Sequence, residues 1–279
     1  MKIATLVPAL TLVTAFSSVG SAGVLYQETF NDLPTGGPDI GGGNPLADDG
    51  WFNANGIDAQ LGGVDDVTTL DGNYMEGPRG SGYSGNAVDD WQQKQFTTPT
   101  ELSATTQNVY YSFNVLPNSF INDGLLLRPS VSPASSGSVN NVGPAFGLVE
   151  EGTDIRLKVR ESPFGAEYVV DPATPIATSD WIELRLVLNQ DTNDITASTA
   201  SLYYRNITQG ETELAPVPGI QDVAIGLSSA VNAGTIDTWI LENFKTQERV
   251  DNLTVGIVPE PGSVALMGLG AVALLRRRR

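Results

Sequence analysis

The chain has 279 residues, with 15 lysine and arginine residues against 32 aspartate and glutamate residues, and it contains no histidine and no cysteine. So acidic a surface repels phosphate backbones, which excludes nucleic acid as a partner. The missing residue types also exclude a Ser-His-Asp or Cys-His nucleophile, a thiolate or imidazole zinc site, and a haem with a histidine or cysteine ligand.

The first 22 residues have the three-part pattern of a secretory signal peptide. Lys2 supplies one charge, an apolar stretch runs from Ile3 to Phe16, and small residues follow as far as Ala22. This pattern predicts export by the Sec machinery and cleavage after Ala22. A permanent N-terminal anchor is the alternative.

Residues 23–257 are predicted to form one all-β domain, because short apolar strands alternate with turn residues and no convincing amphipathic helix appears. Val24 to Phe30 reads as the first strand. From Thr35 to about Gly85 the chain is rich in Gly, Asp, Asn and Pro, which predicts long ordered loops. Trp51 and Tyr74 are expected to anchor these loops.

The second half has clearer strand signals. Asp123-Gly124 lies between apolar runs and predicts a hairpin. Strands at this spacing predict an antiparallel two-sheet sandwich. The predicted strands are Tyr110 to Val115, Ala145 to Val149, Ile155 to Arg160, Tyr168 to Val170, Trp181 to Leu188, Ile195 to Tyr204, Val223 to Leu227, Trp239 to Phe244 and Val250 to Ile257.

The order of these features resembles the concanavalin A-like (laminin G-like) jelly roll. The resemblance rests on the strand from Val24 to Phe30, the strand pair joined across Asn189 to Asp194, and the closing segment from Arg249 to Val255. It implies that the last strand pairs with the first and brings the ends of the domain together. A sandwich of another lineage, such as a different carbohydrate-binding module, stays open.

Residues 258–279 combine a short polar motif, an apolar segment and a basic end. Pro259, Glu260 and Pro261 precede an apolar run from Ser263 to Leu275. This run is a marginal membrane-spanning helix, since a span needs roughly 20 apolar residues. The chain then ends in a cluster that would stay on the cytoplasmic side, namely Arg276, Arg277, Arg278 and Arg279.

This tail resembles the PEP-CTERM sorting signal of exported bacterial proteins. The resemblance implies that the tail is held transiently in the inner membrane and is recognised and cleaved by an exosortase. Removal of the signal peptide takes Lys2, and removal of the tail from Pro259 takes Glu260 and four arginines. The remaining domain has 10 basic and 31 acidic residues, a net charge of −21.

Aromatic residues beside carboxylates are candidate sugar-binding groups, because pyranose rings offer both C–H faces and hydroxyls. Tyr83 and Trp91 flank Asp89 and Asp90 and are the first candidates for ligand binding. The alternative is that the large aromatic residues anchor the core or the loops, since they bury most of their area. Trp51 and Trp239 are aromatic candidates of the same kind, and the anchoring role is the alternative for them too.

Acidic clusters are candidate calcium ligands, because calcium takes six to eight oxygen ligands. Asp191, Asn193 and Asp194 place three oxygen-bearing side chains close together and are candidate ligands of one structural Ca2+. Hairpin-turn chemistry explains the same residues without a metal. Both explanations stay open.

A catalytic constellation is not found. The spacing of Glu150, Glu151 and Asp154 does not suit the carboxylate pair of a glycoside hydrolase. The strand from Ile155 to Arg160 alternates apolar and basic residues, so its cations share one face. The three cations are Arg156, Lys158 and Arg160. They are predicted either to line a groove for an acidic polysaccharide or to be neutralised by neighbouring acids.

These patterns together predict an exported, exosortase-sorted protein of the cell surface or the extracellular matrix. We expect it to be non-enzymatic and to bind glycan, after passing through an inner-membrane-anchored intermediate. A polysaccharide-active enzyme, either a glycoside hydrolase or a lyase, is the competing function. A purely structural matrix protein is the third.

Overall fold

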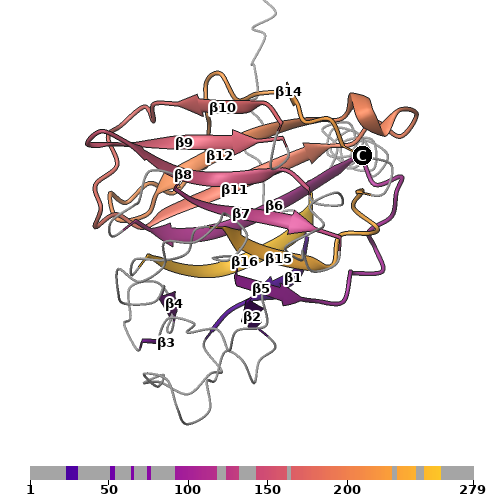
Figure 1. The fold of residues 1–279 in the computed structure, drawn as a ribbon, viewed down its shortest axis with the longest axis horizontal. Helices are drawn as coiled ribbons and strands as arrows, with labels where there is room; N and C mark the ends of the chain where they lie inside the picture. Colours follow the sequence, from indigo (N-terminus) through magenta and orange to yellow (C-terminus); the bar gives the residue numbers. More distant parts are fainter. Residues whose placement is uncertain are drawn as a thin grey trace, which may run out of the picture.

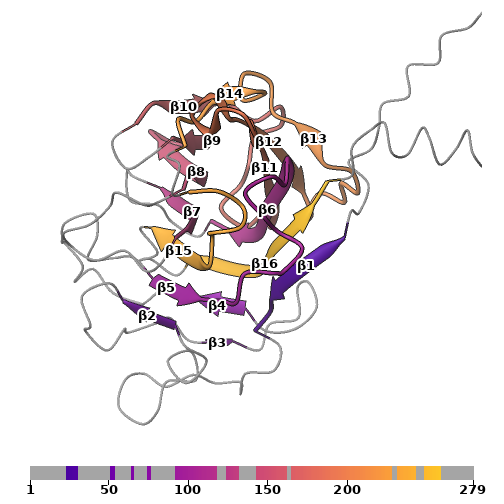
Figure 2. The same cartoon turned by 90° about the vertical axis from the view of Figure 1, so that its right-hand side faces the viewer.

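The computed structural model describes residues 23–30, 51–53, 64–65, 74–76, 92–117, 124–131, 143–161, 165–227, 231–242 and 248–258. Within these ranges the regular elements are β-strands and one short 3-10 helix, η1 (Ile195–Ala197). The strands form two antiparallel sheets that face each other as a sandwich, as Figures 1 and 2 show. The predicted fold class is confirmed.

The larger sheet, sheet A, is built around four long strands in its centre. Its strands are β1 (Val24–Glu28), β3 (Val64–Asp65), β4 (Tyr74–Glu76), β6 (Asn108–Leu116), β11 (Ile182–Asn189), β12 (Thr199–Asn206), β13 (Ala215–Pro216), β14 (Val223–Ala224) and β16 (Arg249–Ile257). Their order is β13-β12-β11-β6-β16-β4-β3, and in addition β1 pairs with β16 and β14 pairs with β12.

The second sheet, sheet B, packs against sheet A across the core. Its strands are β2 (Trp51–Asn53), β5 (Gln92–Gln95), β7 (Leu125–Ser130), β8 (Ala145–Glu151), β9 (Asp154–Arg160), β10 (Glu167–Val170) and β15 (Thr238–Glu242). Their order is β10-β9-β8-β7-β15-β5-β2, so all neighbours are antiparallel.

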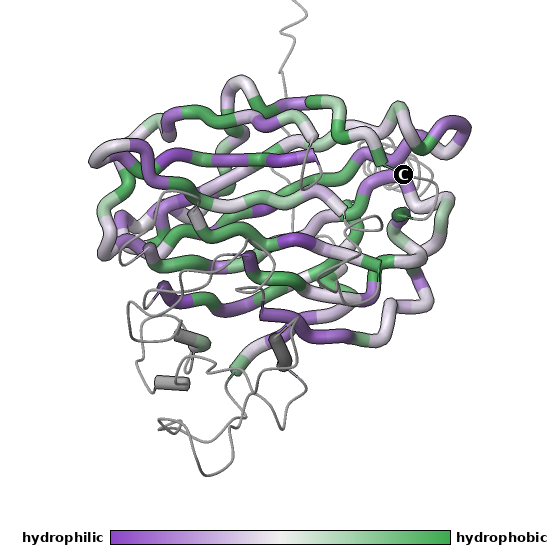
Figure 3. The backbone as a smooth tube through the Cα atoms, in the orientation of Figure 1, coloured by the Kyte–Doolittle hydropathy of each residue, from purple (hydrophilic) through white to green (hydrophobic). Residues whose placement is uncertain are grey.

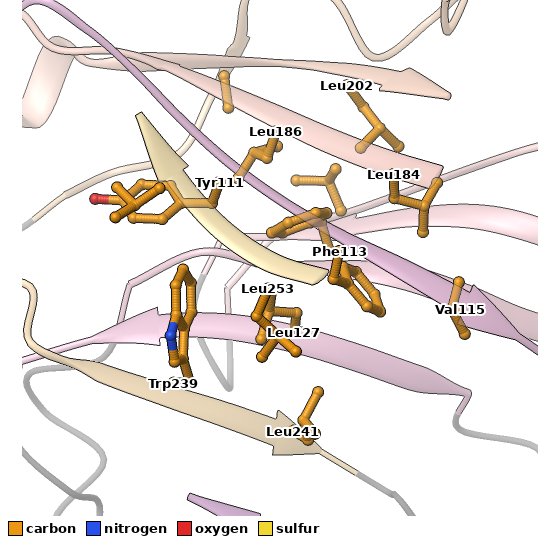
Figure 4. Close-up of a cluster of buried hydrophobic side chains, with 14 of the residues drawn as sticks. Tyr111, Phe113, Val115, Leu127, Leu184, Leu186, Leu202, Trp239, Leu241 and Leu253 are labelled. Atoms are coloured by element: carbon orange, nitrogen blue, oxygen red, sulfur yellow. The ribbon is translucent and has the colours of Figure 1, made fainter. Parts of the chain in front are cut away.

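The core lies between the two sheets because successive side chains on a strand point to opposite faces. Hydrophobic and hydrophilic residues alternate along the strands in Figure 3. In Figure 4 the side chain of Tyr111 on β6 approaches that of Trp239 on β15, and Phe113 on β6 lies beside Leu127 on β7. The strand predicted from Trp181 to Leu188 is confirmed as β11, and its inward face buries four residues fully in this core: Ile182, Leu184, Leu186 and Leu188.

The two ends of the domain lie side by side in sheet A. Val24 on β1 is opposite Gly256 on β16, and the amide of Ile257 donates to the carbonyl oxygen of Gly23 at 3.3 Å. The amide of Val258 donates to the carbonyl oxygen of Asn108 at 2.9 Å. The pairing of the last strand with the first is therefore confirmed, and β16 ends directly before the C-terminal motif.

The hairpin predicted around Asp123-Gly124 is wrong. The strand before it, β6, belongs to sheet A, whereas the strand after it, β7, belongs to sheet B, so the chain crosses from one sheet to the other. Gly124 has φ +73°, and a Cβ there would lie 2.1 Å from the carbonyl oxygen of Leu148 on β8. The glycine is therefore needed because the backbone of β8 lies so close to it, and it does not form a hairpin turn.

The strand predicted from Ile195 begins later than expected. Residues Ile195–Ala197 form η1, because the Asp194 carboxylate accepts a hydrogen bond from the amide of Thr196 at 3.1 Å and caps the turn. β12 then starts at Thr199 and continues to Asn206. The strand predicted over Val223 to Leu227 is also shorter, since β14 covers only two residues.

Among the described residues no helix is long and apolar enough to cross a membrane. The predicted signal peptide with its cleavage point at Ala22, and the predicted tail from Pro259 to Arg279, lie outside the described residues.

Candidate functional site

The aromatic candidates divide into two groups. Trp51 and Trp239 are buried in the core, which confirms the anchoring alternative for these two residues. Tyr83, Trp91, Asp89 and Asp90 lie outside the described residues, and their role in ligand binding stays a prediction.

The turn that contains Asp191, Asn193 and Asp194 has a complete internal hydrogen-bond pattern. One Asp191 carboxylate oxygen accepts from the amide of Asn193 at 2.8 Å and from the amide of Asp194 at 3.1 Å. Asp194 caps η1 with its own carboxylate. Turn chemistry accounts for these conformations, and within the described ranges no three acidic side chains gather as a metal site.

We expect the Asp191 carboxyl to titrate below its ordinary pKa of 3.8, because the amides of Asp194 and Asn193 donate to its charged form. A lowered folded-state pKa contributes stability that is present above 3.8 and is lost as the pH falls through the folded value. The side-chain carbon shift of Asp191, followed by NMR against pH, measures the midpoint. Asp191→Asn assigns the signal, and a midpoint at or above 3.8 would contradict the expectation.

The outer face of sheet B carries a cluster of charged residues on strands that are otherwise apolar. We call it the sheet B cluster. The alternation of β9 directs Lys158 and Arg160 away from the core, towards the same side as Arg128 on β7. Two carboxylates complete the cluster, Glu167 on β10 and Glu242 on β15.

Glu242 holds two guanidinium groups at once. Its Oε1 accepts from Nε of Arg128, and its Oε2 accepts from Nη2 of Arg160. Arg128 also donates from Nη1 to the carbonyl oxygen of Gly143. The side chains of Arg128 and Glu242 are 0% and 1% exposed, so this is a buried ion pair. Burial lowers the pKa of Arg128, and the charge and hydrogen bond of Glu242 oppose that shift.

Arg160 reaches Glu242 across two intervening strands. β9 and β15 are separated by β8 and β7, a distance of about 14 Å at the usual strand spacing. Ala145 and Gly147 on β8 lie beneath this path, and a Cβ on Gly147 would lie 2.0 Å from the carbonyl oxygen of Leu125. Small residues here leave room for the long side chains that meet above them.

The rim of the cluster is more exposed than its centre. Lys158 Nζ lies 3.0 Å from Glu167 Oε1, and Arg160 Nη1 lies 3.7 Å from the same atom. The Glu167 side chain is 44% exposed, compared with 10% for Lys158. Farther along β9, Arg156 pairs with the exposed acids Glu151 and Asp171. The cations therefore have acidic partners, as the neutralised-face alternative predicts.

The sheet B cluster nevertheless has an excess of cationic groups over carboxylates. It contains three cations and two carboxylates, and with Arg156 its face carries four of the ten basic residues between Gly23 and Val258. Among the described residues, Arg128 Nη2 and Arg160 Nε have no hydrogen-bond partner, and both atoms are buried. A guanidinium group presents its donors as a planar fork that matches carboxylate oxygens.

The sequence patterns did not identify Arg128 and Glu242 as candidate site residues. Each is a single charge inside an apolar strand, in Leu125–Ser130 and Thr238–Glu242 respectively. Because a buried charge needs a partner, such isolated charges in two apolar strands are a signal that the strands meet.

The outer face of sheet A is polar in a different way. Glu183 accepts from Arg185 at 3.0 Å and from Nε of Arg205 at 2.7 Å. The Arg185 guanidinium also lies 4.5 Å from the ring centre of Tyr110. Asp251 belongs to the same row as Glu183, so two carboxylates lie with Arg185 and Arg205 on this face.

Residues 258–279 match the PEP-CTERM protein-sorting motif. This motif indicates an exported protein that is recognised by exosortase and sorted at the membrane towards the cell surface or the extracellular space. No curated protein matches the chain.

Several solved structures are similar to the chain, including these three. A PL-14 alginate lyase from Aplysia kurodai matches with 10% identity over 85% of this chain and 100% of that chain, with a TM-score of 0.51. The T. cruzi calreticulin globular domain matches with 11% identity over 91% and 95%, with a TM-score of 0.47. An engineered GH43 glycoside hydrolase matches with 12% identity over 85% of this chain, with a TM-score of 0.45, and the chain spans only 41% of its length.

Identity this low supports the fold and nothing finer. The likeness to the alginate lyase agrees with a jelly-roll sandwich for the cargo domain that precedes the sorting motif.

Proposed function

We propose that this PEP-CTERM protein is a non-enzymatic component of the cell surface or extracellular matrix that binds anionic polysaccharide through the sheet B cluster. The observation that carries the proposal is the gathering of cations on one face of a domain whose net charge is −21. Carboxylate or sulfate groups of a polysaccharide are the chemical class that such a face would bind. The Sec machinery and an exosortase are the partners of its export.

Glu167 is the group that a ligand would replace. It is the exposed partner of both Lys158 and Arg160, and exposed ion pairs contribute only about 0–1 kcal/mol. Glu242 would remain in place, because it is buried and holds Arg128 and Arg160 in position. A ligand carboxylate can therefore take the place of Glu167 without disturbing the buried part of the cluster.

Two substitutions at the rim are expected to change affinity in opposite directions. Lys158→Gln removes a ligand contact and should weaken retention on an anionic polysaccharide. Glu167→Gln removes the competing acid and should strengthen it. A charge contact of about 1 kcal/mol corresponds to roughly fivefold in Kd. Affinity electrophoresis in gels that contain alginate or a sulfated polysaccharide, at low and high salt, measures both effects.

Arg205→Gln is the matched control, because it removes the same charge from the outer face of sheet A, where Arg205 is 31% exposed. It should leave retention unchanged. If Arg205→Gln weakens retention as much as Lys158→Gln does, the attraction is general and the sheet B cluster is not the site. Equal retention on neutral polysaccharides would also contradict the proposal.

The same polysaccharides separate binding from catalysis. We expect saturable retention with no new reducing ends and no unsaturated products. Turnover would favour the polysaccharide-active enzyme, and neither retention nor turnover would favour the structural matrix protein.

A further inference from the structure

The two processing junctions of the chain leave the domain at one place. Gly23, which follows the predicted signal cleavage point, accepts a hydrogen bond from Ile257 in β16. Val258, which begins the sorting motif, donates to Asn108 at the start of β6. The start of β1 and the end of β16 are therefore neighbours, and Figure 2 shows them at the same end of the sandwich.

The same end contains two more segments, residues 103–107 and residues 190–198. The amide of Gln190 donates to the carbonyl oxygen of Gln107 at 2.8 Å, and its Oε1 accepts from the amide of Ala233 at 2.9 Å. We call this end of the molecule, formed by Gly23, Val258 and these two segments, the terminal pole.

The chain between the terminal pole and the apolar tail is short. Val258 is still bonded to β6, and the apolar run begins at Ser263. Five Cα–Cα steps span at most about 18 Å even when fully extended. The headgroup layer occupies roughly 5–8 Å of that distance. Two of the linking residues are proline, which restricts how the link can bend.

We propose that the terminal pole faces the membrane surface in the sorting intermediate, and that removal of the tail releases it. The proposal rests on the sorting motif and on the position of the domain ends, and it is independent of polysaccharide binding. The occupant of this surface is the lipid headgroup layer around the inserted tail.

The composition of the terminal pole explains why release follows cleavage. Residues 103–107 and 190–198 contain no lysine or arginine, whereas they contain Asp191 and Asp194. Anionic headgroups attract basic clusters and repel acidic ones. The pole therefore has no affinity of its own for an anionic bilayer, and the tail alone keeps it there.

Two turn threonines form a matched pair of probe positions. Thr192 is exposed in the terminal pole, and Thr153 is exposed in the turn between β8 and β9. β15 begins near Ala233 at the terminal pole, and β7 and β8 are antiparallel to their neighbours, so the β8–β9 turn lies at the opposite end, as in Figure 1. The strands between the ends are about 30 Å long.

The cysteine-free sequence allows one label at a time. The full chain with its tail, carrying Thr192→Cys or Thr153→Cys and a fluorophore, is reconstituted in anionic vesicles with headgroup-spin-labelled lipid. We expect quenching at position 192 to be several-fold stronger than at position 153. Equal quenching at both positions, or stronger quenching at 153, would overturn the orientation.

The release step has its own measurement. A chain that ends at Val258 keeps every described strand, and circular dichroism checks that it is folded. We expect it to remain in the supernatant when the same vesicles are sedimented, and a folded chain that sediments with them would overturn the release. Loss of polysaccharide retention in Lys158→Gln leaves both results unchanged, so the two proposals can fail separately.

Discussion

Replacing Glu242 with alanine is expected to lower the free energy of unfolding by about 3–5 kcal/mol, the usual cost of removing one partner from a buried ion pair. The substitution leaves Arg128 fully buried with no carboxylate, and it removes one of the two partners of Arg160. The loss is large because an uncompensated buried charge keeps its desolvation cost.

Urea denaturation followed by tryptophan fluorescence measures this loss. The control is Glu151→Ala, which breaks the exposed pair with Arg156 and should cost no more than about 1 kcal/mol. If Glu242→Ala and Glu151→Ala have the same small effect, the pair formed by Arg128 and Glu242 is not buried in solution.

A second variant distinguishes the effect of the unpaired charge from the effect of the lost side-chain volume. Arg128→Met combined with Glu242→Leu removes both buried charges and fills their volume with apolar atoms. We expect it to recover most of the stability that Glu242→Ala loses, because apolar replacement of a buried pair is often neutral. Arg160 keeps Glu167 as a partner and is 18% exposed, so it does not become a buried charge without a partner.

The sandwich was predictable from the sequence because its main strands have strong local patterns. The alternation in β9 identified its inward face correctly, and the apolar run from Val250 located β16 to within a residue. The pairing of β1 with β16 followed from the jelly-roll resemblance and not from the residues themselves. The boundary at Val258 was visible because the strand pattern ends where the polar motif begins.

The connections between sheets were not predictable in the same way. An Asp-Gly pair between two apolar runs suits a hairpin and a crossover equally, and only the partners of β6 and β7 distinguish the two. Those partners come from strands far away in the sequence, so local turn chemistry does not specify them.

The sheet B cluster has the same limitation. Arg128 and Glu242 are 114 residues apart, and their pairing depends on β7 and β15 being neighbours. The three cations of β9 were visible from their alternation, whereas their acidic partners on β10 and β15 were visible only as isolated charges. Sequence reasoning therefore identified one strand of the candidate site and left the other three unassigned.

The two proposals are compatible in space. The strands of sheet B run from the terminal pole to the opposite end, so the outer face of this sheet lies along the flank of the domain (Figure 1). In the proposed orientation the pole faces the membrane and the sheet B cluster faces sideways. Polysaccharide binding is therefore not expected to require prior removal of the tail.

Replacing Trp239 with alanine is expected to cost about 3–5 kcal/mol of stability, the range for large aromatic side chains in a core. Trp239 is fully buried. Its ring stacks on Phe96 with 4.9 Å between the ring centres, and it makes a T-shaped contact with Tyr111 with 6.0 Å between the ring centres. The removed ring would leave a cavity between β15 and β6, where neighbours from both sheets cannot close up freely. Chemical denaturation measures the loss.

The same variant tests whether Trp239 is a sugar-binding residue. The Trp239 side chain points into the core, on the opposite face of sheet B from Lys158. At a temperature where the variant is still folded, its retention on anionic polysaccharide should therefore equal that of the natural protein. Lost retention with unchanged stability would assign Trp239 to a ligand site instead. If Trp239 is a core residue, the variant loses stability but keeps its retention on polysaccharide. The packing beneath sheet B is then weaker, whereas the sheet B cluster keeps its geometry.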